Sequence, residues 1–500
     1  MPTVTASMLY DFVACPHRVS MDLFANPADR DDVSPFVQLL WDRGFEHEQE
    51  VITSLQRPFL DLSGVAGDVK ERLTLEAMDR GEPLIYNGRI SANDLLGVPD
   101  FLRKEDGGYI AGDIKSGSGE ESGGDEDAEG KPKKHYGVQV ALYTDILGQL
   151  GRSAGRRGFI WDIQGTEVPY DLDALYGVRN PRSMWQDYQE CLAQVRAIVS
   201  ATSKTIAAYS SGCKNCVWYS ACIDALEKAN DLTLIYNLGR SKRDVMVDQI
   251  ATLRDLAEIN PEGFETGKGN KTVFTGIGAE SLRKFQARAI LSVTKDAKPY
   301  LPAPVALPTN QRELFFDIEV DPMRDVCYLH GFVERNGSDN SGETFHAFFA
   351  DEPSAASEEQ AFAAAWKFIK ERQPCAIYYY SKYERTLYRK LQGKYPAVCS
   401  AADIEALFAA PETVDLLYDV VTKATEWPTR DYSLKTLAKF LGFGWRDIHP
   451  SGAASIEWFN RWVESQDQSI KQRILDYNED DCRATRILLD GIRAMGSDAS

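Results

Sequence analysis

Long apolar runs, a signal sequence and internal repeats are all missing from this sequence. No stretch of about 18 apolar residues occurs, which excludes an ordinary membrane-spanning helix. The first residues, Met1 to Thr5, lack the basic start and apolar core of a signal peptide, so we expect a cytoplasmic protein. No fixed-period repeat is evident, which argues against a solenoid.

A basic surplus is also missing. The chain has 56 Lys and Arg residues against 75 Asp and Glu residues, which gives a net charge of −19. A nucleic-acid binder usually carries a basic footprint, so this balance slightly lowers the expectation of one. It does not exclude a nuclease, because nuclease sites gather carboxylates around metal ions and need only local Lys and Arg on the binding face.

The length of the chain points to several domains. Its 500 residues exceed one ordinary core, and 43% of them are hydrophobic, which suffices for two or three packed interiors. We predict an α/β domain over 1–227, a helical connector over 228–308 and a second α/β domain over 309–500. Segments 251–257 and 275–279 of the connector are similar to parts of helix-hairpin-helix units, although a plain helical connector fits as well.

The segment between Ser116 and His135 is rich in Ser, Gly, Asp and Glu and ends in a basic run at 131–134. Such a composition cannot bury apolar surface, so we predict a disordered surface loop. A solvated insertion is the simplest interpretation, and its acids could also shield a neighbouring site from duplex DNA. These acids are Glu120, Glu121, Asp125, Glu126, Asp127 and Glu129.

The nine cysteines are unevenly spread. A cytoplasmic protein is not expected to use them as a disulfide framework. Three lie close together, Cys213, Cys216 and Cys222, and a fourth ligand is expected from Cys15 near the start of the chain. Four thiolates suit zinc or a [4Fe–4S] cluster, and ligand type alone does not separate the two. The scattered remainder are interpreted as buried thiols: Cys191, Cys327, Cys375, Cys399 and Cys482.

A first group of acids lies on predicted strands of the N-terminal domain. Asp100 is placed on a strand over 97–102, and Asp113 and Lys115 on the next strand, where alternation puts both side chains on one face. Two aspartates can hold Mg²⁺ or Mn²⁺, and the lysine can orient water or neutralise charge. Downstream, Gln139 and Tyr143 are four residues apart on one helix face.

A second group of acids lies in the C-terminal domain. Asp317 and Glu319 alternate onto one face of an apolar strand, where two acids are costly without a cation or metal. Tyr477 and Asp481 have helical i, i+4 spacing. Asp415 ends another predicted strand and is expected to line the same site.

The N-terminal motifs, taken in order, resemble the RecB-type PD-(D/E)xK nucleases with an iron–sulfur staple. The series comprises Cys15, His47, Pro99-Asp100, Asp113-x-Lys115, Gln139-x-x-x-Tyr143, Cys213, Cys216 and Cys222. The resemblance implies His47, Asp100 and Asp113 as metal ligands and Lys115 as the catalytic lysine. It implies Gln139 and Tyr143 as organisers of the site, and it favours a [4Fe–4S] cluster over zinc.

The C-terminal motifs resemble the DEDD exonucleases of the RNase H-like superfamily, in the form whose helical residue is tyrosine. This resemblance implies Asp317, Glu319 and Asp481 as ligands of two metals and Tyr477 as the residue that orients water. The family's remaining Asp is replaced here by Glu384, which is one methylene longer and makes activity at this site a question. The expected fold class is therefore α/β multidomain, with a RecB-type restriction-endonuclease-like domain, a helix-hairpin-helix-like connector and an RNase H-like domain.

Together these resemblances predict a metal-dependent nuclease. DNA is the expected substrate, cut at single strands or ends during repair or processing. A ribonuclease and a non-catalytic nucleic-acid-binding scaffold are the alternatives. Some relatives continue into a helicase, which leaves room for a separate helicase partner. An ATPase site in this chain is not expected, because segment 263–268 is one residue short of a phosphate-binding loop and lacks its Ser or Thr.

Overall fold

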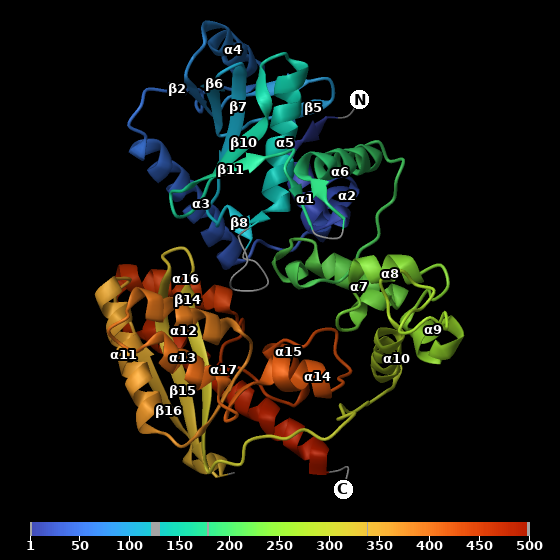
Figure 1. Cartoon of the computed structure of the whole chain (residues 1–500), viewed down its shortest axis with the longest axis vertical. Helices are drawn as coiled ribbons and strands as arrows, with labels where there is room; N and C mark the ends of the chain where they lie inside the picture. Colours follow the sequence, from blue (N-terminus) through green and yellow to red (C-terminus); the bar gives the residue numbers. More distant parts are fainter. Residues whose placement is uncertain (1–2, 122–130, 178–179, 338, 498–500) are drawn as a thin grey trace. The chain divides into compact units, whose positions relative to one another are not determined.

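The computed structural model of the chain describes residues 3–121, 131–177, 180–337 and 339–497 (Figure 1). It divides into two compact units: unit 1 spans Met1–Ala207 and Ser211–Ile223, and unit 2 spans Ala208–Ser210 and Asp224–Ser500. Among the described residues, no helix is long and apolar enough to cross a membrane. The predicted domain boundaries stay predictions.

Unit 1 is built on a six-stranded sheet of order β11-β10-β7-β6-β3-β2, with β10 parallel to β7 and β2 parallel to β3. A small sheet of order β1-β5-β4 and two two-stranded pairs, β8-β9 and β12-β13, complete its strands. The strands are β1 (Val4–Thr5), β2 (Leu60–Asp61), β3 (Leu84–Tyr86), β4 (Ile90–Ala92), β5 (Leu95–Gly97), β6 (Phe101–Glu105), β7 (Gly108–Ile114), β8 (Glu120–Glu121), β9 (Lys131–Pro132), β10 (Ser153–Trp161), β11 (Glu167–Asp171), β12 (Leu175–Tyr176) and β13 (Arg182–Ser183).

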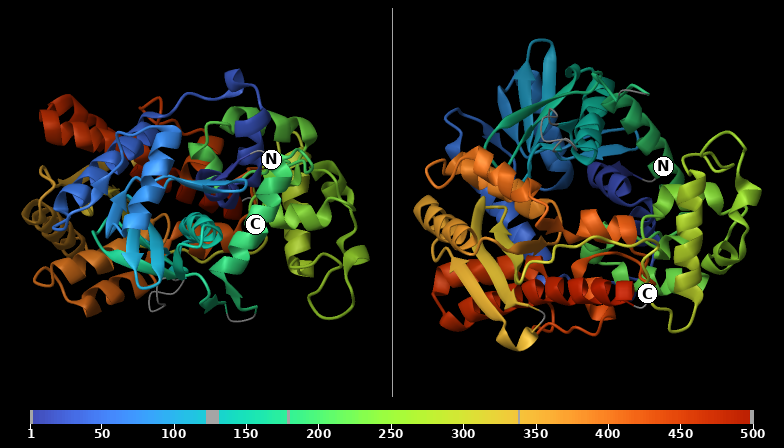
Figure 2. Two further views of the ribbon diagram at one scale, coloured as in Figure 1. Left: turned by 90° about the horizontal axis from the view of Figure 1, so that it is seen from above. Right: turned by 60° about the horizontal axis from the view of Figure 1, so that its bottom comes forward.

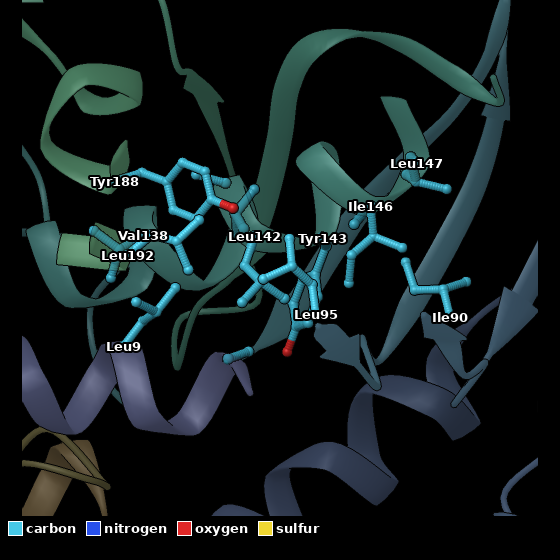
Figure 3. Packing of buried hydrophobic residues seen from close by; sticks show 14 of the residues in the cluster. Leu9, Ile90, Leu95, Val138, Leu142, Tyr143, Ile146, Leu147, Tyr188 and Leu192 are labelled. Atoms are coloured by element: carbon cyan, nitrogen blue, oxygen red, sulfur yellow. The ribbon is translucent and has the colours of Figure 1, made fainter. Parts of the chain in front are cut away.

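Helix α5 packs along this sheet at β7 and β10. It comes close to β10 because Gly158 has no side chain, and a Cβ there would lie 2.3 Å from Val140 Cγ1. Figure 3 shows the buried side chains around α5, including Leu142 and Ile146. The helices of this half are α1 (Ala6–Ala14), α2 (Pro16–Phe24), η1 (Pro27–Asp29), α3 (Pro35–Ser54), α4 (Gly67–Arg80), α5 (Lys134–Gln149), α6 (Met184–Val199) and η2 (Ser211–Asn215), followed by α7 (Tyr219–Ala229).

One strand prediction in unit 1 is corrected. The predicted strand over 97–102 is broken, because β5 ends at Gly97 and β6 begins at Phe101, and Pro99 between them has no N–H for a ladder. Asp100 therefore precedes β6 and is not part of a strand. Between β3 and β4 the chain turns at Asn87, which adopts φ 55°.

The predicted acidic loop is partly ordered. Glu120 and Glu121 form β8, which pairs with Lys131 and Pro132 of β9. These four residues are exposed, as expected for a solvated insertion. Its other acids lie outside the described residues: Asp125, Glu126, Asp127 and Glu129.

Unit 2 begins with short helices, in which α9 packs against α10. Gly276, with φ +79°, and Gly278 lie in the turn that leads into α10, at the position of the predicted hairpin. These elements are η3 (Leu232–Leu234), α8 (Gly239–Met246), α9 (Leu253–Glu258), η4 (Pro261–Phe264) and α10 (Ala279–Val293).

The rest of unit 2 surrounds a five-stranded sheet of order β16-β15-β14-β17-β18, in which β14, β17 and β18 are parallel and the β14–β15–β16 meander is antiparallel. The strands are β14 (Arg312–Asp321), β15 (Val326–Asn336), β16 (Thr344–Phe349), β17 (Ala376–Tyr379) and β18 (Thr413–Asp415). The last helix, α17 (Gln468–Ser497), packs against β14 and β15 and is the long red helix of Figure 2.

The remaining helices of unit 2 connect and cover these strands. They are η5 (Asn340–Gly342), α11 (Ala355–Glu371), α12 (Tyr383–Lys394), α13 (Ala401–Ala409), η6 (Leu416–Val421), α14 (Thr422–Ala424), α15 (Leu434–Phe440) and α16 (Gly452–Ser465).

Candidate active sites

Two aspartates of unit 1 meet beside the β6–β7 hairpin. Asp100 directly precedes β6, and Asp113 lies near the end of β7, where it is 2% exposed. The Asp100 N–H lies 3.4 Å from Asp113 Oδ1, and the Ile114 N–H donates to Asp100 Oδ2 at 2.7 Å. Burial, and then the neighbouring Asp113, raise the pKa of Asp100 well above its ordinary range. The structure thus brings the two predicted ligands together.

Lys115, which directly follows β7, joins this pair beside Asp113. Its Nζ donates to Asp113 Oδ2 at 2.9 Å. Burial lowers the pKa of Lys115, but the charges of Asp113 and Asp100 raise it by more, so the ammonium group stays charged. One lysine therefore faces two carboxylates.

Helix α5 supplies the two predicted organisers of this site. Tyr143 is hydrogen-bonded to Asp113, and burial, followed by the nearby aspartates, raises the pKa of Tyr143 well above its ordinary value. Gly97 makes room for the ring, because a Cβ there would lie 2.5 Å from Tyr143 Cδ1. Gln139 is buried on the same helix, and its Oε1 lacks a hydrogen-bond partner within the described ranges.

His47 lies on α3 and is buried. Its Nε2 is 3.0 Å from the carbonyl oxygen of Asp162, so Nε2 carries the proton and donates there. A metal-binding histidine usually donates its second ring N–H in this way, which leaves Nδ1 for the metal. Within the described ranges His47 does not form a compact three-ligand group with Asp100 and Asp113, so its role as a ligand stays a prediction.

Unit 2 holds a tighter group of acids. Asp317 and Glu319 share one face of β14, and Asp481 reaches them from α17. One carboxylate oxygen from each lies within 4.8 Å of the other two. Burial raises the pKa of Glu319 to about 8, and Asp481 adds to the shift. The pKa of Asp317 is raised well above its usual range by burial, and then by Asp481 and Glu319.

Asn478 fixes the position of Asp317. Its Nδ2 donates to Asp317 Oδ2 at 2.7 Å, across 161 positions of sequence. Gly331, which pairs with Asp317 across the β14–β15 ladder, makes this possible. A Cβ on Gly331 would lie 1.6 Å from Asn478 Oδ1, so any side chain there would displace the amide.

Lys435 is the cation of this second group. Its Nζ lies 2.8 Å from the Tyr477 hydroxyl and 3.2 Å from Asp481 Oδ1. Trp445 Nε1 donates to the same Asp481 oxygen at 2.7 Å. Tyr477 is 2% exposed, and burial, followed by Asp481, raises its pKa well above the ordinary value. The helical tyrosine is therefore held at the acids, as its spacing predicts.

Glu384 lies beside this group but outside it. It raises the pKa of Asp317, although the compact set in the described part of the chain does not include it. Its Oε2 is 3.5 Å from Ser381 Oγ. Burial raises the pKa of Glu384 to about 8, and Asp415 adds to the shift. Asp415 caps the following turn through its Oδ1, while its Oδ2 lacks a partner within the described ranges.

Both acid groups suit divalent cations. Buried carboxylates that repel one another are costly unless a cation neutralises them, and oxygen ligands suit Mg²⁺ and Mn²⁺. In unit 1 the fitting donors are Asp100 and Asp113, with His47 Nδ1 as an additional nitrogen. In unit 2 they are the three oxygens of Asp317, Glu319 and Asp481.

The cysteine cluster gathers from both ends of unit 1. Cys15 lies between α1 and α2, and Cys213 is in η2. Burial raises the pKa of Cys216, and Cys15 and Cys213 raise it further, which places all three thiols near one another. Cys222 follows one turn into α7. The donor set fits a thiolate-bound metal or cluster, whereas the five scattered cysteines are buried, as predicted.

Three functional candidates were not singled out from the sequence. Glu48 accepts from the Tyr86 hydroxyl at 2.6 Å and raises the pKa of Asp100. Its adjacency to His47 on α3 is the only signal for it. Lys435 and Asn478 contact residues that are far away in the sequence, so spacing alone could not reveal them.

The comparisons with known proteins agree with this geometry. Residues 17–223 match the model of the PD-(D/E)XK nuclease superfamily, and residues 314–492 match the model of the RNase H superfamily. No curated protein matches the chain. Both superfamilies typically use divalent metals, and the acids of unit 2 could bind one. The chain therefore carries a PD-(D/E)XK nuclease superfamily domain followed by an RNase H superfamily domain.

Proposed function

We propose that this protein is a metal-dependent nuclease that hydrolyses DNA phosphodiester bonds, at single strands or ends, in DNA repair or processing. The observation that carries the proposal is the contact of Lys115 with Asp113, at 2.9 Å, beside Asp100, whose pKa is raised. Acid, acid and lysine in this order are the groups that metal-assisted hydrolysis of a phosphodiester requires.

In unit 1, Asp100 and Asp113 would hold Mg²⁺ or Mn²⁺, with His47 as a further ligand. Such a metal supplies Lewis-acid polarisation of the phosphate and acidifies its water. Lys115 stays charged and orients water or neutralises the charge that develops on the phosphate. Tyr143 fixes Asp113 through its hydrogen bond, and Gln139 offers from the same helix an amide oxygen that has no partner among the described residues.

In unit 2, the residues would support a second hydrolytic site of the two-metal kind. Asp317, Glu319 and Asp481 would hold the metals, and Glu384 would reach them with its longer side chain. Tyr477 would orient the attacking water, with Lys435 setting the position of its hydroxyl at 2.8 Å. Because Glu384 lies outside the compact group, we propose unit 1 as the main site of cleavage and unit 2 as the secondary one.

The four cysteines would hold a [4Fe–4S] cluster. Cys15, Cys213, Cys216 and Cys222 come from the two ends of unit 1, so the cluster would act as a staple that closes the domain. We assign this cluster a structural role. A cytoplasmic location and a separate helicase partner also remain part of the proposal.

The test is a paired assay on protein purified anaerobically. Labelled single- and double-stranded DNA and RNA are incubated with Mn²⁺ or Mg²⁺ and with wild type, Asp113→Ala or Asp317→Ala. We expect Asp113→Ala to remove DNA cleavage and Asp317→Ala to remove at most a separate exonuclease activity. Full cleavage by both variants would refute the proposal.

Two alternatives have specific support. The position of Glu384 outside the acid group favours a unit 2 that binds nucleic acid without cutting it. Two-metal chemistry does not distinguish sugars, so RNA is the other alternative substrate. Cleavage of RNA alone in the paired assay would establish the ribonuclease.

A further inference from the structure

Two lysines from separate segments converge on one tyrosine ring in unit 1. Lys115 Nζ lies 5.6 Å from the centroid of Tyr136, and Lys133 Nζ lies 5.3 Å from the same centroid. Lys115 follows β7, whereas Lys133 follows β9 and is the N-cap residue of α5. Folding therefore brings Lys133, at the basic end of the acidic insertion, close to Lys115, the proposed catalytic lysine.

The place is closely packed. A Cβ on Gly117 would lie 3.2 Å from the Tyr136 hydroxyl and 3.8 Å from Lys133 Nζ. Because this glycine has no side chain, space remains beside the hydroxyl and the ammonium group. His135 packs edge-on against Tyr136 at 4.4 Å between centroids. Burial, and then the nearby charges of Lys133 and Lys115, lower the pKa of His135 to about 4.

The two neighbouring lysines of the insertion differ in their charge partners. Lys134 Nζ is 3.3 Å from Asp187 Oδ1. For Lys133, no carboxylate lies within 4.0 Å among the residues that the structure describes. Two ammonium groups at one ring repel each other, and Asp113 offsets the charge of Lys115. The first turn of α5, which has no side-chain cap, adds further positive potential.

We propose that Lys133, Tyr136 and Lys115 form a phosphate subsite of the unit 1 active site. It binds one phosphate of the nucleic-acid strand next to the bond that is cleaved. Lys133 and the Tyr136 hydroxyl donate to the phosphate oxygens, and Lys115 is shared between this phosphate and Asp113. The inference rests on the proposed function, because it assumes a nucleic-acid substrate, and it assigns Lys133 as a positioning residue.

The test compares the two adjacent lysines. Lys133→Ala, Lys133→Arg and Lys134→Ala are titrated with fluorescent single-stranded DNA in EDTA, over a series of salt concentrations. We expect Lys133→Ala to weaken binding about fivefold to tenfold and to reduce the slope of log K against log salt by about 0.7, the value for one single-strand phosphate contact. Lys133→Arg restores the slope, and Lys134→Ala stays within about twofold of wild type.

The same chemistry could come from an internal phosphodiester or from a terminal phosphate. The titration is therefore repeated with strands that carry a 5′-phosphate or a 5′-hydroxyl. A defect of Lys133→Ala on both strands assigns the subsite to an internal phosphate, and a defect on the 5′-phosphorylated strand alone assigns it to the strand end. Equal binding by Lys133→Ala and Lys134→Ala on both strands would overturn the inference.

Failure of this inference and failure of the proposed function give different results. Binding in EDTA reports the phosphate subsite without catalysis, whereas cleavage with Mn²⁺ by Asp113→Ala reports the proposed active site. A lost Lys133 effect with intact dependence of cleavage on Asp113 would reject the subsite alone. Thermal unfolding of Lys133→Ala and Lys133→Arg confirms that the variants remain folded.

Discussion

Both acid groups of this protein bring carboxylates close together, and they offset the repulsion between them in different ways. In unit 1, Asp113 has its own lysine at 2.9 Å, two positions along the strand. In unit 2, three carboxylate oxygens lie within 4.8 Å of one another, and Lys435 divides its bonds between Asp481 and Tyr477. Unit 1 therefore balances part of its charge internally, whereas unit 2 gathers more carboxylates around one lysine and raises the pKa values of two of them.

The difference also concerns how the groups are assembled. The unit 1 acids sit beside one hairpin, so their positions follow from local structure. The unit 2 acids meet only when α17 docks against β14. Under the proposed function, unit 1 would carry out a lysine-assisted reaction, and unit 2 would depend more on bound metal for its stability.

The largest expected effect tests the internal lysine of unit 1. In an Asp317→Ala background, Lys115→Ala should lower kcat for DNA cleavage by about 10²–10³-fold, the usual loss when a charge-stabilising group is removed. The measurement is single-turnover cleavage with Mn²⁺. Lys104→Ala, an exposed lysine of β6, is the control. A loss of less than about fivefold for Lys115→Ala would show that this lysine does not distinguish unit 1 from unit 2.

The second effect tests the proposed cysteine staple of unit 1. Cys216→Ser should remove the broad visible absorption of an iron–sulfur cluster and destabilise unit 1 by about 3 kcal/mol, because the two ends of the domain are no longer tied. Iron content, absorption and calorimetric unfolding are measured under anaerobic conditions. Cys191→Ala, at a buried thiol of unit 1, should keep the colour. A colourless wild-type protein that contains zinc would contradict the cluster.

The third effect tests the long-range assembly of unit 2. Gly331→Ala places a methyl group on Asn478, so the bond from Asn478 to Asp317 is lost and unit 2 is destabilised by about 2 kcal/mol. The affinity of unit 2 for Mn²⁺, measured by calorimetry, should also fall. Gly393→Ala is the matched control, because its added Cβ meets no atom within 4 Å. Equal behaviour of the two variants would show that Asn478 does not fix Asp317.

Local patterns predicted much of both sites. Alternation along β7 and β14 placed Asp113 with Lys115 and Asp317 with Glu319, and helical spacing placed Tyr477 with Asp481. The break at Pro99, which removes Asp100 from a strand, was missed because a short apolar run resembles a continuous strand.

Long-range packing was not predictable in the same way. Asn478 reaches Asp317 only because Gly331 has no side chain, and no sequence spacing encodes that fit. The basic end of the insertion was noted only as composition, whereas folding brings Lys133 to the ring that also faces Lys115. Single-sequence patterns reveal the residues of one element, and tertiary packing decides which elements meet.

The smallest effect concerns the pH dependence of metal-free unit 2. The ordinary pKa of a glutamate, 4.5, is raised to about 8 at Glu384, first by burial and further by Asp415. The folded state therefore keeps a proton that the unfolded state loses. The stability that this proton provides is present below pH 4.5 and is lost as the pH rises toward 8.

In EDTA, the free energy of unfolding of wild type should therefore fall relative to that of Glu384→Gln, by about 1 kcal/mol per pH unit between roughly pH 5 and 7. Chemical denaturation at several pH values measures it. Glu464→Gln, at an exposed position of α16, should run parallel to wild type. If Glu384→Gln runs parallel as well, Glu384 is already ionised in the fold, and burial in unit 2 does not hold its proton.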